Sequence, residues 1–271
     1  MIISSKDNEI VKEIRKLKEK KYRKEKFIVE GIKMLEEAMN ENASIDLIII
    51  REGINLDLDI SEFKSIVVTE KVFNTLTDVV SPQGVLAVIN KKSAENTNNE
   101  NIKSIDTKNI TELQIDKNAD YILAIDGIQD PGNLGTIIRT ADSANLKQII
   151  VSKNTVDSYS PKVIRSTMGA IYRVNIIETE NLVETLEKLK EEGFKVVTTS
   201  LDTDNSVYDI SYDKSIVVIG NEANGVSKEV QDMSDYKVKI PMLGKTESLN
   251  ASVAAGIMIY EYVREKIMKK R

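Results

Sequence analysis

Hydrophobic residues in the first 90 positions alternate between helical and extended spacing. Residues 8–40 have a helical pattern, with apolar residues at 10, 11, 14 and 17. A short strand predicted at 27–31 interrupts this helical pattern. Further strands are predicted at 44–50, 66–68 and 83–89, and further helices at 32–39 and 71–80. This alternation predicts a small α/β domain over residues 1–90.

A second alternation of strands and helices starts at Tyr121. Strands are predicted at 121–125, 148–152, 173–177, 194–199, 215–220 and 237–240, and helices at 133–145, 161–169, 180–192 and 247–268. The pattern predicts a mostly parallel sheet with helices on both faces, in a domain over residues 119–271. Residues 91–118 are rich in asparagine and charge, and they are predicted to be a linker.

The composition removes several kinds of chemistry. The 271 residues include no cysteine and no histidine, so a disulfide, a thiolate nucleophile, a Cys/His zinc site and a histidine general base are all excluded. We expect no metal. No apolar run approaches the roughly 18–20 residues of a membrane span, and the first residues do not resemble a signal peptide. A cytoplasmic location without membrane contact is therefore expected.

The charge is unevenly distributed along the chain. The formal net charge is −5, but residues 1–26 hold ten Lys/Arg and five Asp/Glu, which is a local excess of 10 − 5 = +5. Such a patch can bind RNA phosphates even on an acidic protein, because ions in solution screen charges beyond about 10 Å. The alternative interpretation is a solvated helix face.

The first candidate site is the turn Asp130-Pro-Gly-Asn-Leu-Gly135, which follows the strand at 121–125. Its glycines, Gly132 and Gly135, are three apart, so the turn does not match the G-x-G-x-x-G dinucleotide fingerprint. Asn133 is predicted to cap the following helix, whose free N–H groups could hold an anion. Arg139 lies three residues before Asp142 on the same helix face, so it either pairs with Asp142 or serves a site.

Two later turns also contain polar residues after a strand. The turn after Gly220 contains Glu222 and lacks the lysine of a phosphate-binding loop, because Val226 stands in its place. Glu222 either belongs to a site or lies solvated in an ordinary turn. After Ile240, a helix is predicted to begin near Ser248, with Asn250 close to its start. The small residues of 251–256 then favour close packing in the core or at a dimer contact.

The three turns follow strands of one predicted parallel sheet, so their side chains should converge at its carboxyl edge. The expected pocket contains Asn133, Arg139, Glu222, Ser248 and Asn250.

These segments together resemble the SpoU-type RNA ribose 2′-O-methyltransferases of the SPOUT superfamily. The three family motifs resemble Asp130-Pro-Gly-Asn-Leu-Gly135 with Arg139-Thr-Ala141, Ile219-Gly-Asn-Glu-Ala-Asn-Gly225, and Ile240-Pro-Met242 with Ser248-Leu-Asn-Ala-Ser-Val-Ala-Ala255. The segment Ser160–Ala170 fits the part between the first two motifs. Phe27-Ile-Val-Glu-Gly31 and Ser81-Pro-Gln-Gly-Val85 resemble the RNA-binding domain of ribosomal-protein-L30-like fold that precedes the catalytic domain in many members.

The resemblance implies a trefoil-knotted C-terminal domain and a homodimer formed through it. It also implies S-adenosylmethionine as cofactor, held through backbone groups by Gly220, Ile240 and Leu249, with Ser200, Leu201 and Met242 in the same cofactor-binding set. RNA contacts are expected from Lys12–Lys26, Arg165 and Arg173. The implied reaction is methylation of a ribose 2′-OH, with 23S ribosomal RNA as the expected substrate. A tRNA methyltransferase and a non-catalytic RNA-binding protein are the alternatives.

The candidates for help with the 2′-OH proton are Arg139, Glu222 and Ser248. A guanidinium with a pKa above about 12 cannot serve as a base. Arg139 is therefore expected to clamp a phosphate or stabilise the developing alkoxide, while Asn133 and Asn250 position the ribose.

Overall fold

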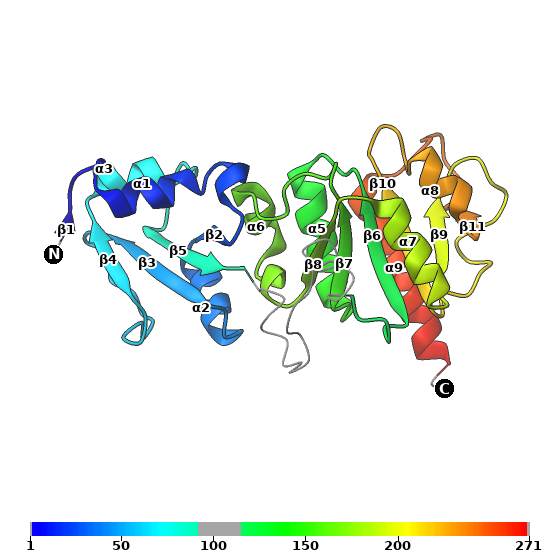
Figure 1. Cartoon of the computed structure of the whole chain (residues 1–271), viewed down its shortest axis with the longest axis horizontal. Coiled ribbons are helices and arrows are strands. Elements are labelled where there is room, and N and C mark those ends of the chain that lie inside the picture. The colour runs from blue at the N-terminus through cyan, green and yellow to red at the C-terminus, as the bar shows by residue number, and fades with distance from the viewer. Residues whose placement is uncertain (1, 92–114, 270–271) are drawn as a thin grey trace. The chain divides into compact units, whose positions relative to one another are not determined.

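The computed structural model describes residues 2–91 and 115–269. The chain forms two compact units, one made of Met1–Asn98 with Tyr159–Tyr172 and the other of Asn99–Ser158 with Arg173–Arg271. Figure 1 gives the element labels used below. Most of the predicted linker, 91–118, lies outside the described residues, and the domain boundaries predicted around it stay a prediction.

The first unit is built on a mixed five-stranded sheet with strand order β1-β4-β3-β5-β2. Its strands are β1 (Ile2–Ile3), β2 (Lys26–Glu30), β3 (Ile45–Arg51), β4 (Ser65–Val68) and β5 (Val85–Asn90). Its helices are α1 (Glu9–Lys16), η1 (Lys20–Tyr22), α2 (Ile32–Asn40), α3 (Glu70–Leu76), α6 (Pro161–Thr167) and η4 (Ala170–Tyr172). β4 is parallel to β1 and β3, and β5 is antiparallel to β2 and β3.

Apolar side chains of α1 and α3 form one core of this unit against the sheet. Val11 and Ile14 of α1 pack in a cluster with Phe73 of α3 and with Ile49 and Leu86 of the sheet. The helical spacing of α1 therefore reflects burial of one face. β1 was not predicted, because two residues give no periodicity.

The segment Tyr159–Tyr172 packs within the first unit, although it follows β7 in sequence. The Tyr159 ring lies 4.9 Å from that of Phe27, and the Tyr172 hydroxyl donates to the Met34 carbonyl at 3.1 Å. α6 ends at Thr167 rather than at 169 because Met168 adopts a left-handed conformation (φ 50°). The segment Tyr159–Tyr172 therefore belongs structurally to the first unit.

The second unit contains a six-stranded sheet in which every pair is parallel. Its strands are β6 (Tyr121–Asp126), β7 (Gln148–Ser152), β8 (Asn175–Thr179), β9 (Lys195–Thr199), β10 (Ser215–Gly220) and β11 (Tyr236–Val238), in the order β11-β9-β10-β6-β7-β8. Its helices are α5 (Pro131–Ser143), α7 (Leu182–Glu191), α8 (Lys228–Met233) and α9 (Ala251–Met268). The predicted α/β class and parallel sheet are confirmed, and threading of the C-terminal segment stays a prediction.

Helices cover both faces of this sheet. Leu186 of α7 and Val230 of α8 share a core cluster with Ile122 and Ile216. Successive strand residues point to opposite faces, so Tyr121 lies on the other face, where its ring stacks on Tyr262 of α9 at 4.5 Å. None of the helices in the described ranges is long and apolar enough to span a bilayer.

Candidate active site

The carboxyl ends of β6 and β10 lie side by side. The two strands pair in register, with Gly220 opposite Asp126. From this pair the sheet extends through β7 and β8 in one direction and through β9 and β11 in the other. In parallel α/β sheets such a reversal of strand order is where ligands bind.

The loops that leave β6 and β10 are joined directly. Asn221 Nδ2 donates to the Gly127 carbonyl at 2.7 Å, and the Ser227 N–H donates to Asp126 Oδ2 at 2.8 Å. The Gly127 N–H is bonded in turn to the Ser152 hydroxyl at 3.0 Å. The β6, β7 and β10 loops therefore form one hydrogen-bonded platform.

Gly220 allows the β10 turn to close on itself. Asn221 and Gly225 exchange backbone hydrogen bonds of 2.9 Å, which brings the turn back over the strand end. A Cβ atom on Gly220 would lie 2.1 Å from Gly225 C and from Val226 N. Only glycine fits this close approach of two backbone segments.

Asn133 does not cap α5, and this prediction was wrong. Asp130 is the cap, with Pro131 in the first helical turn, and Asp130 Oδ1 accepts from the Asn133 N–H at 2.9 Å. An acidic residue followed by proline is a common helix start, so the sequence did contain the signal. Asn133 lies inside the first turn, and its side chain is available for other contacts.

Glu222 anchors the start of α5. Its carboxylate accepts from the N–H groups of Gln129 (3.0 Å) and Asp130 (3.1 Å) and from Asn133 Nδ2 (2.9 Å). Partial burial tends to raise the pKa of Glu222, but the hydrogen bonds from Asn133, Gln129 and Asp130 lower it below its ordinary value. Glu222 is therefore ionised and bonded to the first motif although it is exposed, and its place in a functional site stays a prediction.

Asn250 connects α9 to α5. It caps α9, accepting at Oδ1 from the N–H groups of Ser252 (2.9 Å) and Val253 (3.4 Å), and its Nδ2 donates to Asn133 Oδ1 at 2.9 Å. The helix therefore begins at Ala251, later than the predicted start near Ser248. Ser248 is exposed and makes no side-chain hydrogen bond with the described residues.

Arg139 remains outside this hydrogen-bonded group. It is exposed on α5, and no described residue forms an ion pair with it. Asp142, its predicted alternative partner, instead accepts from Arg173 Nε at 2.9 Å. The interpretation as an intrahelical Arg139–Asp142 pair was therefore wrong, and Arg173 is occupied by this contact.

The small residues of α9 serve contacts within the chain. Ala255 is fully buried, and a Cβ on Gly256 would lie 3.9 Å from Thr140 Cγ2 of α5. Farther along, the Tyr260 hydroxyl lies 3.1 Å from Ser143 Oγ. α5 and α9 thus run side by side from their first turns, which keeps Asn133 and Asn250 together.

The predicted cofactor residues follow the adjacent strands β9, β10 and β11. They are Ser200 and Leu201 after β9, Gly220 at the end of β10, and Ile240 and Met242 after β11, with Leu249 before α9. Leu201 and Leu249 are exposed apolar side chains, and the strand ends provide backbone N–H and C=O groups. Uncharged groups of this kind suit a purine base, so the residues fit an adenine-containing cofactor.

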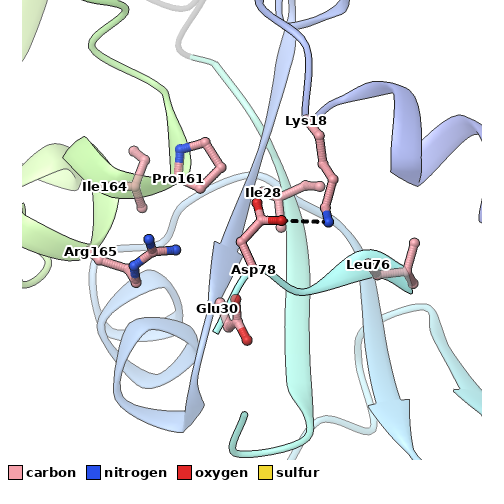
Figure 2. A pocket seen from close by; sticks show the side chains of 8 residues that line it. All are labelled: Lys18, Ile28, Glu30, Leu76, Asp78, Pro161, Ile164 and Arg165. Atoms are coloured by element: carbon pink, nitrogen blue, oxygen red, sulfur yellow. Dashed lines mark hydrogen bonds and ion pairs between the residues drawn. The ribbon is translucent and has the colours of Figure 1, made fainter. Parts of the chain in front are cut away.

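A separate small pocket lies in the first unit, and Figure 2 shows its lining. It is lined by Lys18, Ile28, Glu30, Leu76, Asp78, Pro161, Ile164 and Arg165. The pocket has room for about one water molecule, which is too small for a nucleotide. Lys18 donates to Asp78 Oδ1 at 2.7 Å, and Arg165 lies near Glu30. These two predicted RNA contacts therefore face acidic groups of their own chain.

Glu30 is expected to make stability depend on pH. Burial raises the pKa of Glu30, against the opposing effects of the Thr77 hydrogen bond and the Arg165 charge. A carboxyl group whose pKa is higher in the folded than in the unfolded protein lowers the stability of the fold as the pH rises past its unfolded-state pKa. Glu30→Gln should therefore unfold at a higher temperature than the wild type at about pH 7, with a smaller difference near pH 4. Thermal unfolding checks this, with the exposed Glu62→Gln as control, and a pH-independent difference would contradict it.

Several cations of the basic N-terminal stretch are neutralised locally. Ion pairs join Lys12 to Glu9, Lys16 to Glu13, Lys21 to Glu19 and Lys26 to Asp46. Arg23 is buried and donates to the Leu17 carbonyl at 2.7 Å. Three of these acidic partners are already counted in the stretch, so only the pairs with Asp46 and Asp78 lower its positive excess, and RNA contact by it stays a prediction.

Known RNA methyltransferases match both parts of the chain. The model of the SpoU rRNA Methylase family matches residues 120–260, and the MRM3-like substrate binding domain matches residues 8–87. The chain is 30% identical over 262 residues to the 23S rRNA (guanosine(2553)-2′-O)-methyltransferase RlmP of Bacillus subtilis. This alignment covers 95% of this chain and 97% of the Bacillus protein.

Two solved structures show how far the likeness extends. The AdoMet-bound rRNA methyltransferase from Sinorhizobium meliloti is 28% identical, with a TM-score of 0.79 over 98% of each chain. The TrmH/SpoU tRNA modifying enzyme of A. aeolicus is 31% identical, with a TM-score of 0.51 over 56% of this chain and 77% of that one. The family matches include the segments that carry Asn133, Glu222 and Asn250, and the chain belongs to the SpoU rRNA methylase family.

Proposed function

We propose that this protein methylates a ribose 2′-OH in 23S ribosomal RNA, with S-adenosylmethionine as methyl donor. The observation that carries the proposal is the hydrogen-bonded group Glu222–Asn133–Asn250, which joins all three family motifs at the switch point of the sheet. Residues far apart in sequence meet there around polar groups that suit a ribose. An enzyme with this substrate would work in the cytoplasm.

The cofactor would be held by the backbone groups at the ends of β9, β10 and β11. The AdoMet-bound relative supports this assignment. When bound, S-adenosylmethionine supplies an electrophilic methyl group on a sulfonium. The protein then has to orient the ribose oxygen and manage its proton.

Different residues of the site orient the ribose and stabilise its oxygen. Asn133 and Asn250 hold the ribose through their amide groups, and Glu222 fixes Asn133. Glu222 is unsuited to be the base, because three donors already bond its carboxylate. The Arg139 charge would stabilise the ribose oxygen as its proton leaves to water. Ser248 has no assigned contact, and a role for it in the reaction rests on its motif position alone.

The extent of similarity favours ribosomal RNA over tRNA. The Bacillus subtilis relative, named for 23S rRNA, aligns over 95% of this chain, including the first unit. The A. aeolicus tRNA enzyme covers only 56% of it. A non-catalytic RNA-binding protein would not be expected to keep Asn133, Arg139 and Asn250 together.

The direct test is methyl transfer from labelled S-adenosylmethionine to purified RNA. We expect incorporation into 23S ribosomal RNA lacking its 2′-O-methyl groups, at a ribose 2′-oxygen that alkaline hydrolysis mapping identifies. Transfer to tRNA with none to ribosomal RNA would support the tRNA alternative. No transfer to either would contradict the proposed activity.

A homodimer through the second unit forms part of the proposal. An apolar stripe on α9 supports it, because Val253, Tyr260 and Ile267 are 50%, 48% and 52% exposed and lie at helical spacing. Soluble proteins commonly use such a stripe as a contact surface.

Val253→Glu should therefore shift the protein from dimer to monomer, because a carboxylate would have to be desolvated in the contact. Analytical ultracentrifugation checks the state, and the loss of activity should follow it. The matched control is Val80→Glu, at a valine that is 100% exposed in the first unit. A Val253→Glu protein that remains dimeric at micromolar concentration would contradict this contact.

A further inference from the structure

A row of side-chain hydrogen bonds crosses the candidate active site and begins at Ser252, which has no role in the proposed function. Ser252 Oγ donates to Asn250 Oδ1 at 2.6 Å, and Asn250 Nδ2 donates to Asn133 Oδ1 at 2.9 Å. Asn133 Nδ2 then donates to Glu222 Oε1 at 2.9 Å. The row thus runs from α9 through α5 to the loop after β10.

The groups at the two ends of the row determine the direction of every hydrogen bond between them. An ionised carboxylate only accepts hydrogen bonds, so Asn133 must direct its NH₂ group toward Glu222. Its Oδ1 then faces Asn250, which must donate in turn. At the other end, the Ser252 and Val253 N–H groups of α9 require an acceptor, and Asn250 Oδ1 provides it.

A flip of either amide would break this order. With Asn133 reversed, its oxygen would face the Glu222 carboxylate and its NH₂ would face that of Asn250. With Asn250 reversed, its NH₂ would face the donors of α9. Each flip places like groups opposite each other and leaves donors or acceptors unpaired, so one orientation is favoured at both residues.

The fixed orientation determines what the site offers a ligand. An amide NH₂ has two hydrogens, and the row uses one from Asn133 and one from Asn250. No other group in the described part of the chain accepts from these amides, so two N–H donors, one from each residue, are left for a substrate. Donors of this kind match an oxygen with partial or full negative charge, such as a ribose oxygen that is losing its proton.

We propose that Ser252 is a positioning residue for methyl transfer, because its hydroxyl holds Asn250, and through it Asn133, in the orientation that presents these donors. The inference rests on the proposed function. The Ser252 hydroxyl makes the shortest contact to Asn250 Oδ1, and without it that oxygen keeps only the Ser252 N–H at 2.9 Å and the Val253 N–H at 3.4 Å. The Asn250 amide would then rotate more freely.

The first test compares Ser252→Ala with Ser252→Thr in the full-length protein. Loss of the hydroxyl should lower kcat about tenfold with little change in the KM for RNA, because the donors act mainly on the developing charge. Threonine keeps the hydroxyl and should restore most of kcat. Ser143→Ala is the matched control, since it removes a hydroxyl that contacts Tyr260 on the same two helices. A Ser252→Ala enzyme with wild-type kcat would overturn the inference.

A second test separates positioning from a general effect on folding. In a double-mutant cycle, Ser252→Ala should add little to the loss caused by Asn250→Ala, because the Ser252 hydroxyl acts only through Asn250. Losses of activity that add up in the double variant would contradict the inference that the two residues act through one row of hydrogen bonds.

A third test does not depend on activity. In the cofactor-free protein, Ser252→Ala should move the side-chain NH₂ resonances of Asn250 and Asn133 in ¹⁵N-correlated NMR spectra, and Ser252→Thr should return them. Unmoved resonances would show that the hydroxyl does not orient the amides. A wild type that methylates no RNA would refute the proposed function instead, while the spectra still report on the row.

Discussion

Gly220→Ala is expected to destabilise the second unit by about 3 kcal/mol or more and to abolish methyl transfer. The added Cβ would lie 2.1 Å from Gly225 C and Val226 N, and both are backbone atoms. Moving them apart would break the paired hydrogen bonds of Asn221 and Gly225. The displaced turn carries Glu222, so the first motif would lose its anchor as well. Urea unfolding of the full-length protein measures the loss of stability.

The same substitution at Gly256 provides a control with the opposite expected sign. There the new Cβ would make an ordinary 3.9 Å contact with Thr140 Cγ2, in the interior of α9. Alanine is favoured over glycine in a helix by up to about 1 kcal/mol, so Gly256→Ala should be neutral or stabilising. A Gly220→Ala protein as stable as Gly256→Ala would show that the β10 turn can relax without cost.

Arg139→Ala should lower kcat/KM by about 10²- to 10³-fold while leaving stability nearly unchanged. Arg139 is exposed and has no ion-pair partner in residues 2–91 and 115–269, so its removal breaks no described contact. In the proposed reaction its charge stabilises the ribose oxygen or holds an RNA phosphate. Single-turnover methylation over a range of RNA concentrations measures the loss of activity, and thermal unfolding measures any loss of stability.

Arg139→Lys distinguishes a planar guanidinium from a simple positive charge. A bidentate contact needs the planar fork, so lysine should recover only a small part of the activity. Lys147→Ala is the control, because it removes another exposed cation from the same unit. A lysine variant with most of the wild-type activity would contradict the bidentate role, and an equal loss in Lys147→Ala would point to a general charge effect.

Much of the second unit could be predicted from the sequence because its strands are buried on both faces. Ile216–Ile219 and Ile122–Ile125 form continuous apolar runs that are typical of parallel strands. Element ends were harder to predict. The start of α5 was placed at Asn133 because asparagine is a good cap, but Asp130 with Pro131 makes the stronger start.

The candidate site was predictable in part. Strand order at the carboxyl edge explains why Asn133, Glu222 and Asn250 meet, and the motifs identified all three. The identity of each hydrogen-bond partner was not predictable, since it depends on the side-chain directions of elements distant in sequence. Asp142 illustrates this, because its spacing favoured Arg139 while the fold supplies Arg173.

The position of Tyr159–Tyr172 could not be predicted from periodicity, because helical spacing does not indicate which sheet a helix covers. Ile164 and Pro161 lie in a pocket lined also by Ile28 and Leu76 of the first unit, as Figure 2 shows. Such contacts between residues more than 80 positions apart are tertiary and leave no local pattern.

This segment also affects the order in which the protein can fold during synthesis. Domains commonly fold as units while the chain emerges from the ribosome. Here the N-terminal unit lacks Tyr159–Tyr172 until the intervening part of the second unit, Asn99–Ser158, has been made. Until then the edge that receives α6, including Phe27, has no covering partner from this segment. The first unit thus comes first in the gene but cannot be finished first, because its five strands are complete at Asn90 while α6 follows only after residues 91–158 have been made.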